Sequence, residues 1–178
     1  MKPEEVRLVK ACQHRSEWAY KQFYNLFASK MLGVCMRYAR TRDVAQDILH
    51  EGFLRIFANL DKIENVDSLE AWTRRVMVNT AINYVRDLHD NIVLESSEIP
   101  EKEDENCYDL FDMEVLVKAI QALPDNYRMV FNLYEIEGYS HQEIAERLHI
   151  QVSTSRSLLH RAKQRLQELL GNKEDYIR

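Results

Sequence analysis

The sequence predicts an all-α protein made of two small helical domains joined by an acidic linker. Only 4 of the 178 residues are Gly and only 3 are Pro, while 46% are hydrophobic, a composition typical of a soluble chain rich in helix. Apolar residues recur with a helical period on both sides of a stretch, residues 91–111, in which few residues repeat in this way. We therefore expect one domain at residues 1–90 and another at residues 112–178.

The first domain opens with a long predicted helix that Ser16 is placed to cap. A broad stripe of aromatic and aliphatic side chains follows this residue, and we assign it to the core. A second helix is predicted from about Asp43 to Asn59. The members of the stripe are Trp18, Phe23, Leu26, Phe27, Met31, Val34 and Tyr38.

A third helix is predicted from Asp67 or Ser68 to about Leu88, after a short polar loop at residues 61–67. One of its faces can be buried through Trp72, Val76, Ala81 and Val85. Other positions offer positive charge and amide groups, namely Arg74, Arg75, Asn79, Asn83 and Arg86.

The second domain begins with a predicted helix from about Asp112 to Leu123, and Pro124 suits the first position of the next helix. Two short helical patterns separated by a tight turn then run from Gly138 to Leu166. Ser140 and Glu143 form an S-x-x-E capping box at the start of the first pattern.

The turn between the two patterns falls at His149, and His is among the non-glycine residues that best tolerate positive φ. Ile144, Ala145 and Leu148 give the helix before the turn an apolar face. The helix after it keeps a 3.6-residue period through Leu158, Leu159, Ala162, Leu166 and Leu169. This arrangement is typical of a helix-turn-helix.

The helix after the turn contains no acidic residue as far as Leu166, and its outer face is rich in hydroxyl and basic groups. Arg can bind guanine in the major groove through two hydrogen bonds, and hydroxyls can reach phosphates or base edges. An alternative for this segment alone is the solvated face of an ordinary amphipathic helix. The candidate DNA contacts are Ser153, Thr154, Arg156, Ser157, His160 and Arg161.

The net charge of -5 is unevenly distributed along the chain. Residues 91–114 contain nine acidic residues against Lys102 alone, so the rest of the chain carries +3. The acidic character therefore belongs to one segment, and the flanking domains are mildly basic, as a nucleic-acid-binding protein requires.

The residue types argue against an enzyme, a metal site and a bound cofactor. Cys12, Cys35 and Cys107 are odd in number and far apart, which supports neither a disulfide framework nor a zinc site. No Gly-rich phosphate loop or pair of nucleophile and base stands out. Because no apolar run approaches the length of a membrane span and the first residues lack a signal peptide, we expect a cytoplasmic protein.

Three segments resemble the extracytoplasmic-function (ECF) group of bacterial RNA polymerase sigma factors. They read D-V-A-Q-D-I-L-H-E-G-F-L-R-I-F from Asp43, A-W-T-R-R-V-M-V-N-T-A-I-N-Y-V-R from Ala71, and A-L-P-D-N-Y-R-M-V-F from Ala122. Their order and spacing cover nearly the whole chain. The resemblance implies sigma region 2 in residues 1–90 and sigma region 4 in residues 112–178, with a linker that in this family threads toward the RNA exit channel. A solvated tether is the other interpretation of the linker.

By this resemblance, the second helix docks on the clamp helices of the largest polymerase subunit. His50 stands where the family usually has Gln. An ordinary amphipathic helix would explain Phe53 and Phe57 equally well, as core residues. The implied polymerase contacts are Asp47, His50, Glu51, Phe53, Leu54, Arg55 and Phe57.

The third helix and the loop before it resemble the reader of the minus-10 promoter element, where a base is turned out of the opened strand. The loop spans residues 64–70. For the helix, the resemblance implies base or backbone contacts for Asn79 and Asn83, and phosphate contacts for Arg74 and Arg75. Trp72 would pack the helix beneath the loop, although such a residue is more often core.

The minus-35 element would be read by Arg156, Ser157, His160 and Arg161, with Ser153 and Thr154 near the DNA backbone. Three positions depart from the family pattern. Ser153 replaces a usual Gly, Gln151 replaces the Ser that commonly caps the helix, and Ser155 occupies a position often filled by Val.

The implied function is a sigma factor that binds core RNA polymerase, directs it to specific promoters, and promotes minus-10 melting and transcription initiation without covalent chemistry. The implied partners are core RNA polymerase, promoter DNA and an anti-sigma factor, often membrane-bound. The alternative is a stand-alone helix-turn-helix transcription regulator that binds duplex DNA by itself.

Overall fold

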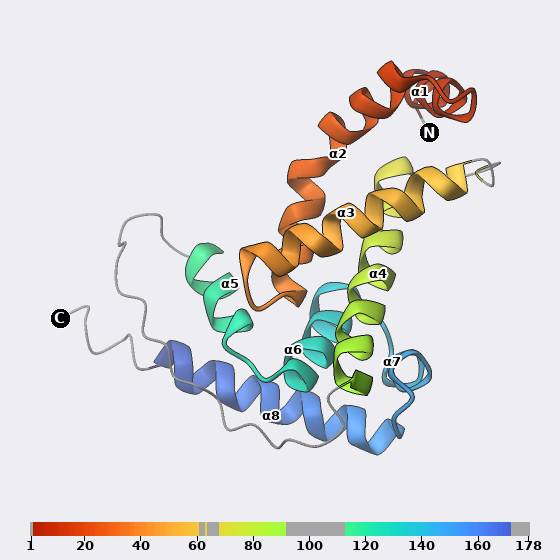
Figure 1. Cartoon of the computed structure of the whole chain (residues 1–178). Coiled ribbons are helices and arrows are strands. Elements are labelled where there is room, and N and C mark those ends of the chain that lie inside the picture. Colours follow the sequence, from red (N-terminus) through yellow and green to blue (C-terminus); the bar gives the residue numbers. More distant parts are fainter. Residues whose placement is uncertain (1, 61–62, 64–67, 92–112, 172–178) are drawn as a thin grey trace. The chain divides into compact units, whose positions relative to one another are not determined.

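The computed structural model of the chain describes residues 2–60, 63, 68–91 and 113–171. All regular secondary structure in these ranges is helical (Figure 1), which confirms the predicted all-α class. The chain divides into two compact units between Tyr84 and Val85. Almost all of the predicted linker, residues 91–111, lies outside the described residues, so its bounds stay a prediction. No described helix combines the length and apolar character needed to cross a membrane.

The first unit contains α1 (Pro3–Gln13), α2 (Glu17–Tyr38), α3 (Arg42–Asn59) and most of α4 (Leu69–Asn91). As predicted, Ser16 caps α2, because its hydroxyl accepts from the Ala19 amide at 3.4 Å. Thr41 and Ser68 perform the same role for the next two helices, through the amides of Val44 and Ala71. Helix α1 was not predicted, although Pro3 at its first position is a helix-start signal.

Helices α2 and α3 pack through aromatic rings. Phe23 and Phe53 meet edge to face at 6.5 Å between ring centres, and the Tyr24 ring lies 4.6 Å from that of Phe53. Phe57 contacts Phe23 at 5.8 Å and Tyr20 at 4.8 Å. Five members of the predicted stripe are indeed buried, namely Phe23, Phe27, Met31, Val34 and Tyr38.

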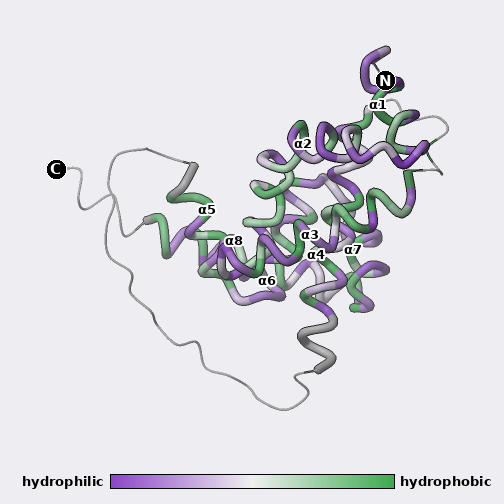
Figure 2. The backbone as a smooth tube through the Cα atoms, turned by 45° about the horizontal axis from the view of Figure 1, so that its top comes forward, coloured by the Kyte–Doolittle hydropathy of each residue, from purple (hydrophilic) through white to green (hydrophobic). Residues whose placement is uncertain are grey.

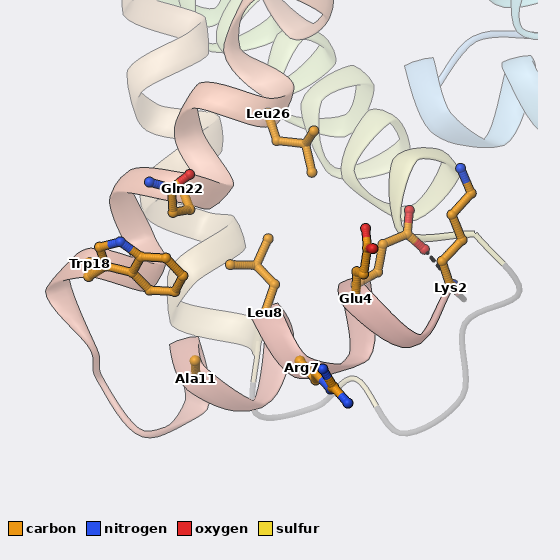
Figure 3. A pocket seen from close by; sticks show the side chains of 9 residues that line it. Lys2, Glu4, Arg7, Leu8, Ala11, Trp18, Gln22 and Leu26 are labelled. Atoms are coloured by element: carbon orange, nitrogen blue, oxygen red, sulfur yellow. Dashed lines mark hydrogen bonds between the residues drawn. The ribbon is translucent and has the colours of Figure 1, made fainter.

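The other two members of the stripe, Trp18 and Leu26, are 65% and 53% exposed, so their assignment to the core was wrong. Both lie on the wall of a groove between α1 and α2, opposite Leu8 and Ala11 (Figure 3). The stripe is therefore wider than the surface that α1 and α3 cover.

Helix α4 turns a different face inward from the one predicted. Ala81 and Val85 are buried as expected, but Trp72 and Val76 are only half-buried. Thr73 and Thr80 take the inner positions, and their hydroxyls donate to the carbonyl oxygens of Leu69 and Val76 at 2.8 and 2.9 Å. Because a threonine can satisfy its hydroxyl within the helix, hydropathy alone underrates it as a core residue.

The second unit contains α5 (Met113–Gln121), α6 (Asp125–Phe131), the π-helical turn η2 (Asn132–Ile136), α7 (His141–Leu148) and α8 (Val152–Gly171). Pro124 is the capping residue before α6, not its first helical residue as predicted. The tube in Figure 2 alternates between hydrophobic and hydrophilic along α8, as an amphipathic helix requires. Its apolar side forms a core from Ile120, Leu123, Ala162 and Leu166, flanked by Ala119, Tyr127, Phe131 and Ile136.

Arg128 joins α5 to α6 from inside this unit. Its side chain is buried and donates to the carbonyl oxygens of Gln121 and Leu123 at 2.8 and 3.1 Å. The same guanidinium pairs with the carboxylate of Asp125. Carbonyl groups at the end of a helix lack hydrogen-bond partners within that helix. This arginine supplies the missing donors where the chain passes from α5 to α6.

Gly52 lets α3 and α4 approach closely. A Cβ at this position would overlap Met77 Sδ and lie 2.8 Å from its Cε, and both residues are buried. We therefore expect Gly52→Ala to lower the free energy of unfolding by about 1–3 kcal/mol, the usual cost of overpacking. Urea denaturation followed by the fluorescence of Trp18 and Trp72 reports this unit, because it holds both tryptophans.

Gly33→Ala is the matched control for this substitution, because Gly33 lies in α2 with nothing within 4 Å of an added Cβ. It should raise stability by about 0.5–1 kcal/mol through helix propensity alone. In a double-mutant cycle, Met77→Ala should remove much of the cost of Gly52→Ala. Additive effects of the two substitutions would contradict the proposed clash.

Candidate nucleic-acid interface

The helix-turn-helix begins at a complete capping box. The Glu143 amide donates to Ser140 Oγ at 3.3 Å, and the Ser140 amide donates to Glu143 Oε2 at 2.8 Å. Hydrogen bonds from the Ser140 amide and hydroxyl hold the pKa of Glu143 below its usual range. This start of α7 confirms the prediction, and Ile144 and Ala145 on its inner side are buried.

The turn between α7 and α8 is made by His149, which adopts the left-handed conformation with φ 54° and ψ 42°. The amides of His149 and Ile150 both donate to the carbonyl oxygen of Ala145. These bonds satisfy the end of α7 in the manner of an αL helix cap. The predicted turn residue is therefore confirmed.

Helix α8 separates a buried side from an exposed side. Ser155, Leu159, Ala162 and Leu166 are buried, and Leu158 and Leu169 are half-buried. Every predicted minus-35 contact is on the exposed side of this helix. Two of the hydroxyls also bond locally, since Ser157 donates to the Ser153 carbonyl at 3.0 Å and Ser153 donates to Gln151 Oε1 at 3.4 Å. The exposed set is Ser153, Thr154, Arg156, Ser157, His160 and Arg161.

The predicted polymerase contacts on α3 divide into surface residues and core residues. Asp47, His50, Glu51 and Leu54 are exposed, and Arg55 is half-buried with its Nε donating to Glu51 Oε1 at 2.8 Å. Phe53, by contrast, is only 3% exposed.

Phe57 is half-buried against the rings of Tyr20 and Phe23. Phe53 therefore belongs to the core between α2 and α3, which argues against its implied contact with polymerase. Phe57 keeps part of its surface exposed, so its implied contact stays a prediction. A shallow hollow of about 320 Å³ opens between the same helices and is lined in part by Tyr24, Leu49 and His50.

On α4, the predicted minus-10 contacts lie on two sides of the helix. Trp72, Arg75, Asn79 and Asn83 are spaced three, four and four residues apart, which aligns them in one stripe. Arg75 is exposed and the other three are half-buried. Arg74 lies outside this stripe, in line with the buried Val78. Residues 64–67 of the predicted specificity loop lie outside the described residues.

Comparison with known proteins identifies both units. The family model described as Sigma-70 region 2 matches residues 23–90, and the model described as Sigma-70, region 4 matches residues 113–166. The ECF RNA polymerase sigma-E factor of Haemophilus influenzae is 25% identical over 181 residues, covering 93% of each chain. The ECF sigma-E factor of Escherichia coli strain K12 is 29% identical over 172 residues, covering 88% of this chain and 89% of its own.

The chain belongs to the sigma-70 family, in its ECF group. The resemblance drawn from its three sequence segments is confirmed. The alternative of a stand-alone helix-turn-helix regulator is disfavoured, because residues 23–90 match sigma region 2.

The fold of this sigma factor agrees with that of a solved relative. The sigma factor RpoE of Bartonella quintana, determined in complex with the anti-sigma factor NepR, superimposes with a TM-score of 0.52. The two sequences are 24% identical, and the match covers 85% of this chain and 96% of the other.

His141 and Ser155 support the candidate interface from the contact between α7 and α8, and neither role was predicted from the sequence. His141 Nδ1 lies 2.9 Å from Ser155 Oγ, and its ring stacks on Tyr134 with 4.4 Å between centres and 25° between planes. Burial, and secondarily the charge of Arg156, lower the pKa of His141. Ser155 precedes Leu159, Ala162 and Leu166 by four, seven and eleven residues, so helical period could have placed it on the inner side.

Cys12 and Cys35 of this sigma factor are buried free thiols. Burial raises the pKa of Cys12 to about 11 and that of Cys35 to about 12, so both stay protonated at neutral pH. Cys107 lies outside the described residues. Within residues 2–60, 63, 68–91 and 113–171, no three His, Cys, Asp or Glu residues are grouped as metal ligands would be.

The left-handed conformation of His149 predicts a stabilising substitution. A residue with a Cβ pays about 1–2 kcal/mol in this conformation, and Gly does not. After allowing for the greater freedom of an unfolded Gly, His149→Gly should stabilise the α7–α8 pair by about 0.5–1 kcal/mol. His149→Val is the matched variant and should destabilise it, because a β-branched residue tolerates positive φ poorly.

Amide hydrogen exchange in α7 and α8 measures both effects within this unit. Slower exchange in His149→Gly and faster exchange in His149→Val are the expected results. Equal exchange in the two variants would show that the turn conformation carries no strain.

Proposed function

We propose that this ECF sigma factor binds core RNA polymerase, directs it to specific promoters, and promotes minus-10 melting and transcription initiation. It performs no covalent chemistry itself and acts in the cytoplasm, where the polymerase transcribes. The observation that carries the proposal is the exposed side of α8, where six candidate DNA contacts lie together on a helix braced by α7. The matches to sigma regions 2 and 4 support it.

Helix α8 is proposed to enter the major groove at the minus-35 element. Arg156 and Arg161 are exposed and can bind base edges or phosphates, while Ser153 and Thr154, in the first turn, suit the DNA backbone. Ser157 and His160 complete the face between them. The first turn of α8 contains no acidic residue, so no carboxylate opposes the approach of phosphate there.

Helix α3 is proposed to dock on the clamp helices of the polymerase. Leu54 is 66% exposed and stands beside the Glu51–Arg55 ion pair. Asp47 and His50 extend the same exposed side toward the start of the helix. An apolar anchor among charged groups is the pattern expected of a protein–protein interface, where charges set the orientation of the partners.

Helix α4 is proposed to receive the opened minus-10 strand. The stripe of Trp72, Arg75, Asn79 and Asn83 combines an aromatic ring, a cation and two amides, which suit stacking, phosphate binding and base recognition. Arg74 would add a second cation beside the stripe. The ring of Trp72 is half-buried, so it can support the loop before α4 while keeping part of its surface accessible.

The proposed partners are core RNA polymerase, promoter DNA and an anti-sigma factor, which in this family is often membrane-bound. The anti-sigma proposal draws support from the solved relative of Bartonella quintana, whose structure includes the anti-sigma factor NepR. Residues 1–90 are proposed to act as region 2 and residues 112–178 as region 4, with the acidic segment 91–111 as the linker between them.

Run-off transcription with core polymerase on a promoter library tests the proposal. The full chain should produce transcripts from a defined subset of promoters, because both promoter elements must match. The chain alone should produce none. Identical transcript starts with and without this protein on every promoter would overturn the sigma assignment.

Arg156→Ala should reduce about tenfold the degree to which transcription depends on the minus-35 sequence. One good base contact contributes about 1–3 kcal/mol of discrimination between bases. Binding to core polymerase should not change. Lys163→Ala is the matched control, because it removes a cation from the same helix whose ammonium pairs with Glu135 at 2.7 Å. A similar loss in both variants would indicate a general charge effect, and loss of core binding in Arg156→Ala would mean that the face is misassigned.

Leu54→Asp should weaken the affinity for core polymerase by about tenfold or more, as for a central interface anchor. The stability of the Leu54→Asp variant should differ little from that of the wild type, because the Leu54 side chain is already exposed to water. Leu26→Asp is the matched control, since Leu26 is also exposed but lies on α2, in the groove that α2 forms with α1. Fluorescence anisotropy of labelled protein titrated with core polymerase measures both, and equal losses would reject α3 as the docking helix.

A further inference from the structure

The contact between α7 and α8 contains a polar connection beside buried apolar residues, among them Ile144, Ala145 and Leu159. The Ser155 side chain is completely buried, and its hydroxyl shares a 2.9 Å hydrogen bond with His141 Nδ1. On its other side, the imidazole stacks on the Tyr134 ring of η2. Three elements of the second unit therefore meet at this histidine.

A hydrogen bond constrains orientation more strictly than apolar contact does, because its energy depends on angle as well as distance. Leu159, Ala162 and Leu166 also hold the inner side of α8, but apolar contacts permit small rotations about the helix axis. A rotation of about 10° moves a side-chain atom on the helix surface by about 1 Å. Displacements of this size are enough to disturb a two-bond contact between an arginine and a base.

The residue after Ser155 is Arg156, which points to the exposed side of the helix. Fixing the rotation of Ser155 therefore fixes the direction in which Arg156 leaves α8. We propose that His141 is a positioning residue that, through Ser155, sets the rotation of α8 and thereby the base preference at the minus-35 element. This inference rests on the proposed function, because it assumes that the exposed side of α8 reads this element.

Comparing Asn with Gln at position 141 distinguishes loss of the hydrogen bond from loss of the imidazole ring, because both variants lack the ring. The side-chain amide of Asn places a polar atom near the position of Nδ1, whereas that of Gln reaches the position of Nε2. His141→Asn should therefore keep the bond to Ser155, and His141→Gln should lose it. Ser155→Ala removes the same bond from the other helix. Gln142→Ala is the control, because Gln142 is the exposed neighbour on α7.

The experiment measures transcription by core polymerase, with each full-length variant, from a library randomised at both promoter elements. In His141→Gln and Ser155→Ala, the preference for the best minus-35 sequences should fall about fivefold, the effect of one lost neutral hydrogen bond. His141→Asn and Gln142→Ala should keep the wild-type preference. The double variant His141→Gln/Ser155→Ala should lose no more than either single variant, and minus-10 preferences should be unchanged throughout.

The pH profile provides a readout that a merely structural role would not produce. Protonated His141 would carry its charge beside Arg156 of α8 while facing Tyr134 of η2. Since the folded protein holds the pKa of His141 below its ordinary value of about 6.5, the neutral ring prevails above that pH and protonation begins below it. Wild-type minus-35 preference should therefore weaken more than that of His141→Asn as pH falls below about 6.5, because the variant shares every other titratable group, including His160, with the wild type.

Equal behaviour of His141→Asn and His141→Gln would overturn the inference, as would additive losses in the double variant. Parallel losses at the minus-10 and minus-35 elements would also overturn it, because they indicate general unfolding. A wild-type protein that shows no minus-35 preference overturns the proposed function, and the inference falls with it. Retained wild-type preference that is insensitive to Ser155→Ala rejects only the positioning role.

Discussion

Each candidate binding surface of this protein is the outer side of a helix whose inner side forms the core. An α-helix advances 3.6 residues per turn, so burying one set of positions leaves a complementary set facing solvent. On α8, burial of Ser155, Leu159, Ala162 and Leu166 leaves Arg156, His160 and their neighbours outside. On α3, burial of Ile48, Gly52 and Phe53 leaves Asp47, Glu51 and Leu54 outside. A change that rotates the core packing therefore also rotates the recognition surface.

Buried polar groups fix the rotation of a helix about its own axis. Apolar packing tolerates alternative arrangements, whereas a buried polar group is stable only where its partner lies. Arg128 satisfies carbonyls at the end of α5, Thr73 and Thr80 satisfy their hydroxyls within α4, and Ser155 bonds to His141. The first three maintain the helices and their connections. The last lies directly beneath the proposed DNA contacts, which is why we assign a positioning role to it.

The proposed function depends on the placement of contacts more than on reactive groups. The buried cysteines agree with this, because burial keeps their thiols protonated and unreactive. The two sigma-70 matches fall mainly in different units, so each proposed recognition surface depends on the core of its own unit. Under the proposed function, promoter selectivity arises from two modest contacts whose free energies combine when both elements are present.

Features that depend on local interactions could be predicted from the amino-acid sequence. These include the helices from α2 to α8, the cap at Ser16, the capping box at Ser140 and the left-handed turn at His149, because each involves residues within one or two helical turns. Three segments were also enough to recognise the sigma family. How much of each helix face is covered by neighbouring helices became known from the packed structure. It exposed Trp18 and Leu26, buried Phe53, and turned Thr73 and Ser155 inward.

Helical period shows which residues share a face, but the width of the buried face depends on the shape of the helices packed against it. Thr73 and Ser155 are polar residues whose burial is possible only because a carbonyl or an imidazole lies within hydrogen-bond distance. For Ser155 that partner is fourteen residues away and on another helix. Such a pairing exists only once the two helices have packed, so the tertiary structure alone could reveal it.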